Sequence, residues 1–145
     1  LKLEINCFEH FTEMGLVEVP FSVGNKWFSG SCKITTYQFA ELLGTKLRAL
    51  YQRKKGRDLF DLYVALKQTD VNPDDVIRCY HKYMRFTVQQ PPTYKQFILN
   101  MEEKIQDPDF LGDSQLLLRP EISFNPQEAY LVVKERLIDR LSWTR

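Results

Sequence analysis

The sequence predicts an α+β fold, with about three strands in residues 1–36 followed by a mainly helical domain in residues 37–145. The first region alternates apolar and polar residues with a period of two, which is typical of half-buried strands. The second region repeats its apolar residues every three to four positions, and helix-start residues stand before three of its segments. The chain has 145 residues, 43% hydrophobic and 13% aromatic. Such values are typical of one folded domain, or part of one.

Three segments carry the strand pattern. Residues 1–7 alternate strictly, with Leu1, Leu3, Ile5 and Cys7 on one side. Residues 16–23 and 27–35 are predicted to pair through a hairpin turn at Gly24-Asn25, because this dipeptide suits tight turns.

Three local features predict details of these strands and the start of the helix that follows them. Pro20 cannot donate a backbone hydrogen bond, so it predicts an edge or irregular position. Gly30-Ser31 is interpreted as a β-bulge. Thr35 or Thr36 is expected to cap a long helix over residues 37–53.

The remaining chain is predicted to be helical except for an extended, proline-containing connection over residues 107–121. Gly56 separates the long helix from a second one that reaches about residue 69. Asn72-Pro73 and Asn125-Pro126 each combine a cap residue with proline at the first helical position. Thr93 and Gln96 form a capping box.

The long helix carries two cations on its apolar face. That face consists of Phe39, Leu42, Leu43, Leu47, Ala49 and Leu50, and the opposite face of Glu41, Thr45, Arg48 and Gln52. Lys46 and Arg53 stand in the middle of the apolar side. An unpaired cation there costs several kcal/mol, so each is expected to have a partner. That partner is either a carboxylate of this chain or an anion from outside.

Two acids begin the second helix. Asp58 and Asp61 are three residues apart and therefore neighbours on one face. In the simplest interpretation, Asp58 favours the helix N-terminus and Arg57 pairs with Asp61 on the surface. In the functional interpretation, these acids and the cations of the preceding helix form one site.

The spacing of these residues matches a longer motif, K-x-x-A-x-x-x-R-x-K-x-R-D-x-x-D-L, filled by Lys46, Ala49, Arg53, Lys55, Arg57, Asp58, Asp61 and Leu62. This motif resembles that of the AbiEii/AbiGii-type nucleotidyltransferase toxins of bacterial toxin–antitoxin and abortive-infection (phage-defence) systems. Lys2 and Glu4 resemble the family's K-x-E-I strand, and residues 107–120 resemble its C-terminal segment. The resemblance covers nearly the whole chain.

The resemblance implies an enzyme that transfers a nucleotide from an NTP to an acceptor, expected to be tRNA, and that a cognate antitoxin neutralises. The strands of residues 1–36 would then end a nucleotidyltransferase-type mixed sheet. Magnesium would act between phosphates and carboxylates. Glu4, Lys46 and Asp58 would be the catalytic residues, with Glu4 also a metal ligand and Asp58 a catalytic or site-organising acid.

The same resemblance assigns a set of substrate-binding residues. Lys46 and Arg53 would hold the triphosphate, and Lys2, Lys55 and Arg57 would add positive charge around it. Asp61 would orient a neighbouring cation.

One part of the family pattern is absent from the printed sequence. Family members carry Gly-Ser followed by an Asp-x-Asp pair that holds the metal, but here the only such pair is Asp107-Pro108-Asp109, interpreted as a turn. We therefore expect the metal-binding half to precede Leu1 and this fragment to be inactive by itself. The alternative is a non-enzymatic module that binds RNA or a partner protein through its basic helix.

Other residue types exclude several classes of site. Cys7, Cys32 and Cys79 lack zinc-type or disulfide-type spacing and are expected to be reduced, buried thiols of a cytoplasmic protein. His10 and His81 are isolated and are interpreted as structural. No apolar segment is long enough to span a membrane.

Overall fold

The α+β class is confirmed in a computed structural model of the chain, which describes residues 8–115, 118, 119 and 121–143. The chain divides into two compact units, Leu1–Gln38 and Phe39–Arg145. The predicted strand at residues 1–7, with Lys2, Glu4 and Cys7, lies outside the described residues.

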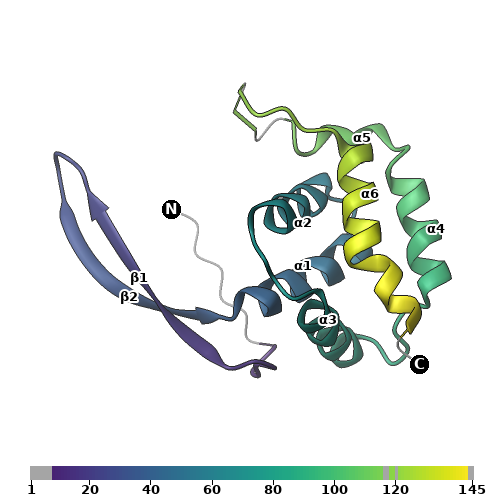
Figure 1. Ribbon diagram of the computed structural model, residues 1–145, viewed down its shortest axis with the longest axis horizontal. Helices are drawn as coiled ribbons and strands as arrows, with labels where there is room; N and C mark the ends of the chain where they lie inside the picture. Colours follow the sequence, from purple (N-terminus) through teal and green to yellow (C-terminus); the bar gives the residue numbers. More distant parts are fainter. Residues whose placement is uncertain (1–7, 116–117, 120, 144–145) are drawn as a thin grey trace. The chain divides into compact units, whose positions relative to one another are not determined.

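In its described residues, 8–38, the first unit forms an antiparallel hairpin of two strands, β1 (Leu16–Gly24) and β2 (Ser29–Tyr37), which lie side by side along their whole length (Figure 1). The Asn25 side chain closes the turn by accepting from the backbone N–H groups of Trp27 and Phe28 at 2.9 and 3.0 Å. The predicted hairpin is therefore present, with its second strand starting two residues later than expected.

Two expectations about the second strand are wrong. The register is continuous from Leu16↔Tyr37 to Gly24↔Ser29, so Gly30-Ser31 forms no bulge. Thr35 and Thr36 do not cap a helix, because β2 continues past them and pairs them with β1. Cross-strand pairing replaces the local capping interaction that the sequence suggested.

The second unit is helical. Its elements are α1 (Phe39–Gln52), α2 (Gly56–Gln68), α3 (Pro73–Thr87), α4 (Tyr94–Lys104), α5 (Pro108–Gly112), α6 (Pro126–Arg136) and the 3₁₀ helix η1 (Ile138–Trp143). The three predicted starts are confirmed: the side chains of Asn72, Thr93 and Asn125 accept from backbone N–H groups of the first turns of α3, α4 and α6. Each cap side chain lies within three residues of the backbone N–H that donates to it, which explains why the sequence alone sufficed.

Helix α5 was not expected, because residues 107–121 were predicted to be extended. Asp107 accepts from the backbone N–H groups of Asp109 and Phe110 at 2.9 and 3.1 Å, and Pro108 follows as the first helical residue. The Asp-Pro pair therefore starts a helical turn, and the side chain of Phe110 is buried.

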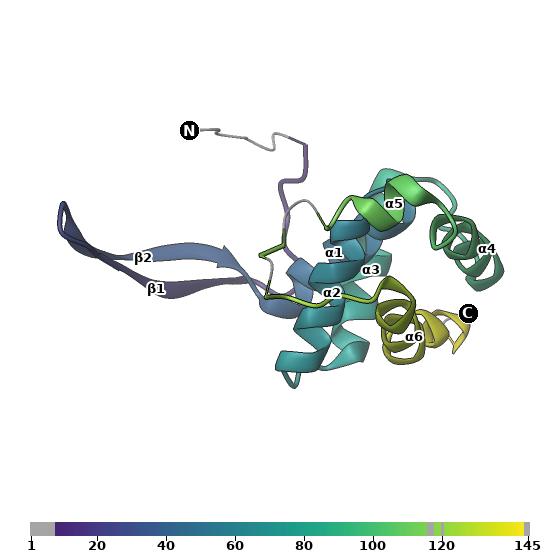
Figure 2. The ribbon, with the colours of Figure 1, turned by 90° about the horizontal axis from the view of Figure 1, so that it is seen from above.

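The core of this unit lies between paired helices. Helix α1 packs against α3 and α2, and α2 also packs against α6, which lies beside it in both views (Figures 1 and 2). At the α1–α3 contact, a Cβ on Gly44 would lie 2.6 Å from the Cβ of Cys79. The two helices therefore approach closely where Gly44 has no side chain.

This packing corrects the predicted faces of α1. Phe39 and Leu42, placed on the apolar side, are 46% and 40% exposed, whereas Glu41, placed on the polar side, has no exposed surface. Because α3 covers the side that bears Glu41 and Gly44, a helical wheel drawn for α1 alone misassigns it.

Smaller corrections concern the C-terminal helix and the thiols. The sequence predicts one helix with a buried stripe of Ala129, Val132, Val133, Leu137 and Leu141, but helix α6 ends at Arg136 and the 3₁₀ helix η1 follows it. In the predicted stripe, Ala129, Val133, Leu137 and Leu141 are buried and Val132 is only half-buried. Cys79 is buried as expected, but Cys32 is exposed.

Candidate functional site

The candidate site is centred on Asp58, the third residue of α2. Its carboxylate has no exposed surface. Arg53 donates to it twice, from Nε to Oδ2 at 2.7 Å and from Nη2 to Oδ1 at 2.7 Å. Lys46 Nζ lies 3.3 Å from Oδ1. Two cations from α1 and the turn after it therefore converge on one buried acid at the start of α2.

This geometry explains the two cations that the sequence places on the apolar face of the long helix. The sequence predicts a partner for Lys46, either a carboxylate of this chain or an outside anion, and the structure shows the carboxylate of Asp58. Arg53 has the same partner. The hydrogen bond to Asp58 raises the pKa of Arg53, while partial burial opposes this effect. The buried carboxylate thus stabilises both cations.

Asp61 completes the inner cluster. Its Oδ2 lies 2.9 Å from Lys46 Nζ, so Lys46 contacts two carboxylates of α2. The side chains of Lys46 and Arg53 are 31% and 51% exposed. Both therefore remain accessible to an anion from solvent while they hold Asp58.

Three further cations, in the turn and at the start of α2, pair with acids from the C-terminal part of the chain. Lys54 pairs with Asp107, Lys55 Nζ lies 3.4 Å from Asp113, and Arg57 Nε lies 4.0 Å from the same residue. Arg57 thus pairs with Asp113, where the simplest interpretation had paired it with Asp61. Burial opposes ionisation of Asp113, but the Arg57 backbone N–H and Lys55 outweigh it, so the pKa of Asp113 is lowered.

The arrangement coincides with the motif that spans Lys46–Leu62. A family model described as "Nucleotidyl transferase AbiEii toxin, Type IV TA system" matches residues 1–131. The chain belongs to the AbiEii family. No curated protein and no solved structure matches it. AbiEii membership places the chain among the nucleotidyltransferase toxins of type IV toxin–antitoxin systems.

Divalent metals such as Mg²⁺ are held in proteins mainly by oxygen ligands such as carboxylates. Within the described residues, no group of three or more His, Cys, Asp or Glu side chains is arranged for it. Asp58 is already bound by two cations, which would repel a metal ion. Asp107 caps α5 and pairs with Lys54. The described residues therefore do not fit a magnesium site. Asp107-Pro108-Asp109, which the sequence suggested to be a turn, forms the start of α5.

Two buried polar residues near the AbiEii motif were missed in the sequence. Glu41 accepts a hydrogen bond of 2.6 Å from the hydroxyl of Tyr83 on α3, and both side chains are buried. Lys104 on α4 is 7% exposed. Lys104 could have been found, because it follows the buried residues Phe97 and Met101 at helical spacing. No local signal distinguishes Glu41.

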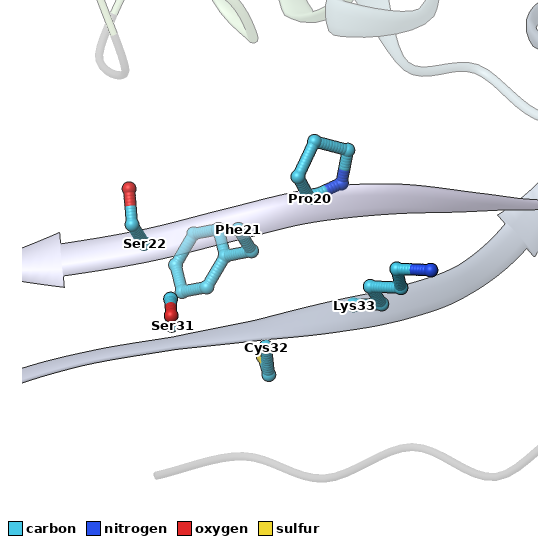
Figure 3. A pocket seen from close by; sticks show the side chains of 6 residues that line it. All are labelled: Pro20, Phe21, Ser22, Ser31, Cys32 and Lys33. Atoms are coloured by element: carbon cyan, nitrogen blue, oxygen red, sulfur yellow. The ribbon is translucent and has the colours of Figure 1, made fainter.

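The hairpin has a separate depression of about 480 Å³ (Figure 3). It is lined by Pro20, Phe21, Ser22, Ser31, Cys32 and Lys33. Among these only Lys33 is charged, and it pairs with Glu18 at 3.1 Å. The depression therefore lacks the converging charges found around Asp58.

In the described part of the chain, no helix has the length and apolar character needed to cross a membrane.

Proposed function

We propose that this AbiEii chain takes part in transfer of a nucleotide from an NTP to an acceptor, with tRNA as the expected acceptor. The observation that supports this proposal is the convergence of Lys46 and Arg53 on buried Asp58. In the reaction, an acceptor hydroxyl attacks the α-phosphorus, the bond to pyrophosphate breaks, and the hydroxyl proton passes to a base. Cations that hold the phosphates stabilise the charge that develops.

Lys46 and Arg53 are assigned to the triphosphate. Arg53 uses Nε and Nη2 on Asp58, so its Nη1 group can donate to a phosphate oxygen. Lys46 has about a third of its side chain exposed and is held from two sides by Asp58 and Asp61. Such fixed cations lose less conformational entropy when they bind phosphate.

Asp58 is assigned as a positioning acid. Its carboxylate has no exposed surface, so an acceptor hydroxyl cannot reach it to give up a proton. Asp58 instead acts through the two cations that it orients. Asp61 has the same role toward Lys46.

The outer residues extend the proposed phosphate site. Lys55 and Arg57 have side chains that are 48% and 45% exposed and would contribute positive charge beyond the triphosphate. Lys2 and Glu4 keep the roles that the family resemblance gives them, Lys2 in substrate binding and Glu4 as the catalytic and metal-binding carboxylate. A cognate antitoxin is the proposed protein partner.

The test uses the complete gene product that contains this chain, expressed from an inducible promoter in bacteria. We expect Lys46→Ala to abolish growth inhibition and transfer of labelled NTP to total tRNA. Lys95→Ala removes an exposed lysine of α4 outside the cluster and should leave both unchanged. Full toxicity of a folded Lys46→Ala protein would contradict the site assignment.

The same experiment separates the alternative function. The turn cations Lys54, Lys55 and Arg57 are each about half exposed, which also suits binding of an RNA backbone without chemistry. An RNA-binding module would retain tRNA without transferring label. Its affinity would fall steeply as salt is raised.

A further inference from the structure

The turn that joins α1 to α2 carries Arg53 and is bound at both ends by residues distant in sequence. At the α1 end, Lys104 Nζ donates to the backbone carbonyls of Leu50 at 2.5 Å and Tyr51 at 2.8 Å. The last carbonyls of a helix have no partner within it, and a cation is favoured there. Lys104 therefore caps the C-terminal end of α1 from α4.

At the other end of the turn, α2 has no local cap, because its N-cap residue Lys55 makes no capping side-chain hydrogen bond. Asp113 supplies the missing acceptor. Its Oδ2 accepts from the Arg57 backbone N–H at 3.2 Å across 56 positions of sequence, and its Oδ1 lies 3.4 Å from Lys55 Nζ. An acid at a helix N-terminus is favoured by the helix dipole.

The segment that bears Asp113 packs closely against the start of α2. A Cβ on Gly56 would lie 2.1 Å from the backbone carbonyl oxygen of Phe110. The side chain of Phe110 is itself buried. Close backbone approach at Gly56 and burial of Phe110 therefore place Asp113 at the start of α2.

These two caps act on the short turn that sets the Arg53–Asp58 geometry. The Arg53 backbone N–H still bonds to Ala49 at 2.9 Å, and the Asp58 N–H bonds to Lys55 at 3.1 Å. Loss of either cap would let the last turn of α1 or the first turn of α2 fray. The bidentate contact of Arg53 with Asp58 would then lose its alignment.

We propose that Lys104 and Asp113 are positioning residues for the cluster of Arg53, Asp58 and Lys46. Lys104 holds the end of α1, and Asp113 holds the start of α2, so that Arg53 faces Asp58 and presents its remaining N–H groups outward. The expected effect on NTP binding rests on the function proposed above. The expected effect on the position of Arg53 rests on the two caps alone.

The experiment compares Lys104→Met and Asp113→Asn in the complete gene product, with Lys95→Met and Asp109→Asn as matched controls from exposed positions of α4 and α5. The first readout is the solvent exchange of the Arg53 Nε proton, followed by NMR. The second is the KM for NTP, measured separately from kcat.

We expect both positioning variants to speed the Arg53 exchange and to raise the KM for NTP by about tenfold, with kcat changed much less and the controls unchanged. A charged hydrogen bond lost from a cap is sufficient for a change of that size. Restoring the acid with Asp113→Glu should recover part of the effect.

Unchanged exchange and KM in folded variants would overturn the inference. If Lys104→Met does not fold, Asp113→Asn decides alone, since it keeps the shape of the side chain. If the wild-type protein transfers no nucleotide, the proposed function fails. Faster Arg53 exchange in the variants would then still support the positioning role.

Discussion

Arg53 and Asp58 form a two-point ion pair across the turn between α1 and α2, with both N–O distances at 2.7 Å. The pair bridges the break between the end of α1 and the start of α2. Its guanidinium is half exposed and its carboxylate is not exposed. Lys46 approaches the same carboxylate from the preceding helix. The three charges therefore join α1, the turn and α2.

The first prediction concerns the stability that Asp58 supplies. Asp58→Asn removes the charge that holds Arg53 and Lys46, and we expect the free energy of unfolding to fall by about 2 kcal/mol. Partial exposure of both cations keeps the loss below that of a fully buried pair. Urea denaturation measures it, with Asp70→Asn, in an exposed segment, as the control. Equal stability of the two variants would refute the proposed role of the pair.

The second prediction concerns the close approach of α1 to α3. A Cβ on Gly44 would lie 2.6 Å from Cys79 Cβ and 2.8 Å from the backbone nitrogen of Tyr80. Backbone cannot move aside as a flexible side chain can, so Gly44→Ala should destabilise by about 1–3 kcal/mol. Gly112→Ala, where nothing lies within 4 Å of the added Cβ, should change stability little. A thermal unfolding comparison that ranked the two variants alike would count against this packing.

The third prediction uses the burial of Lys104. Burial lowers its pKa to about 8, while the charge of Asp58 opposes the shift. In the unfolded chain the lysine pKa is about 10.5, so between pH 8 and 10.5 the unfolded state binds more protons than the native state. Stability of the wild type relative to Lys104→Met should therefore rise with pH across this window and stay level below pH 8.

Denaturation of both proteins at several pH values between 7 and 10 measures this difference. Other groups titrate in the same range, but their contributions cancel because both proteins contain them. A difference that falls as pH rises would mean that Lys104 is not held in its buried position.

The fourth prediction concerns the chain by itself. In the printed sequence, Gly30-Ser31 is not closely followed by an Asp-x-Asp pair, and the one such pair, Asp107-Pro108-Asp109, begins α5. The described residues offer no site for a metal. We expect the purified 145-residue chain to transfer no label from NTP to total tRNA in the presence of Mg²⁺. Clear transfer would show that these residues suffice for the chemistry.

The sequence alone determined features that depend on near neighbours. The starts of α3, α4 and α6 were predictable because a cap side chain binds a backbone N–H within three residues. The need for a partner at Lys46 and Arg53 was predictable because a cation on an apolar face has a cost that does not depend on the rest of the fold.

The tertiary structure decided features that depend on distant residues. Glu41 is buried because α3 packs over it, and no pattern within α1 indicates that contact. Thr35 and Thr36 remain in a strand because β1 pairs with them. Asp113 reaches Arg57 across 56 positions because α5 docks against Gly56. Local hydrogen bonds are set by adjacent residues, but which surfaces meet is set by the packing of the whole helical unit.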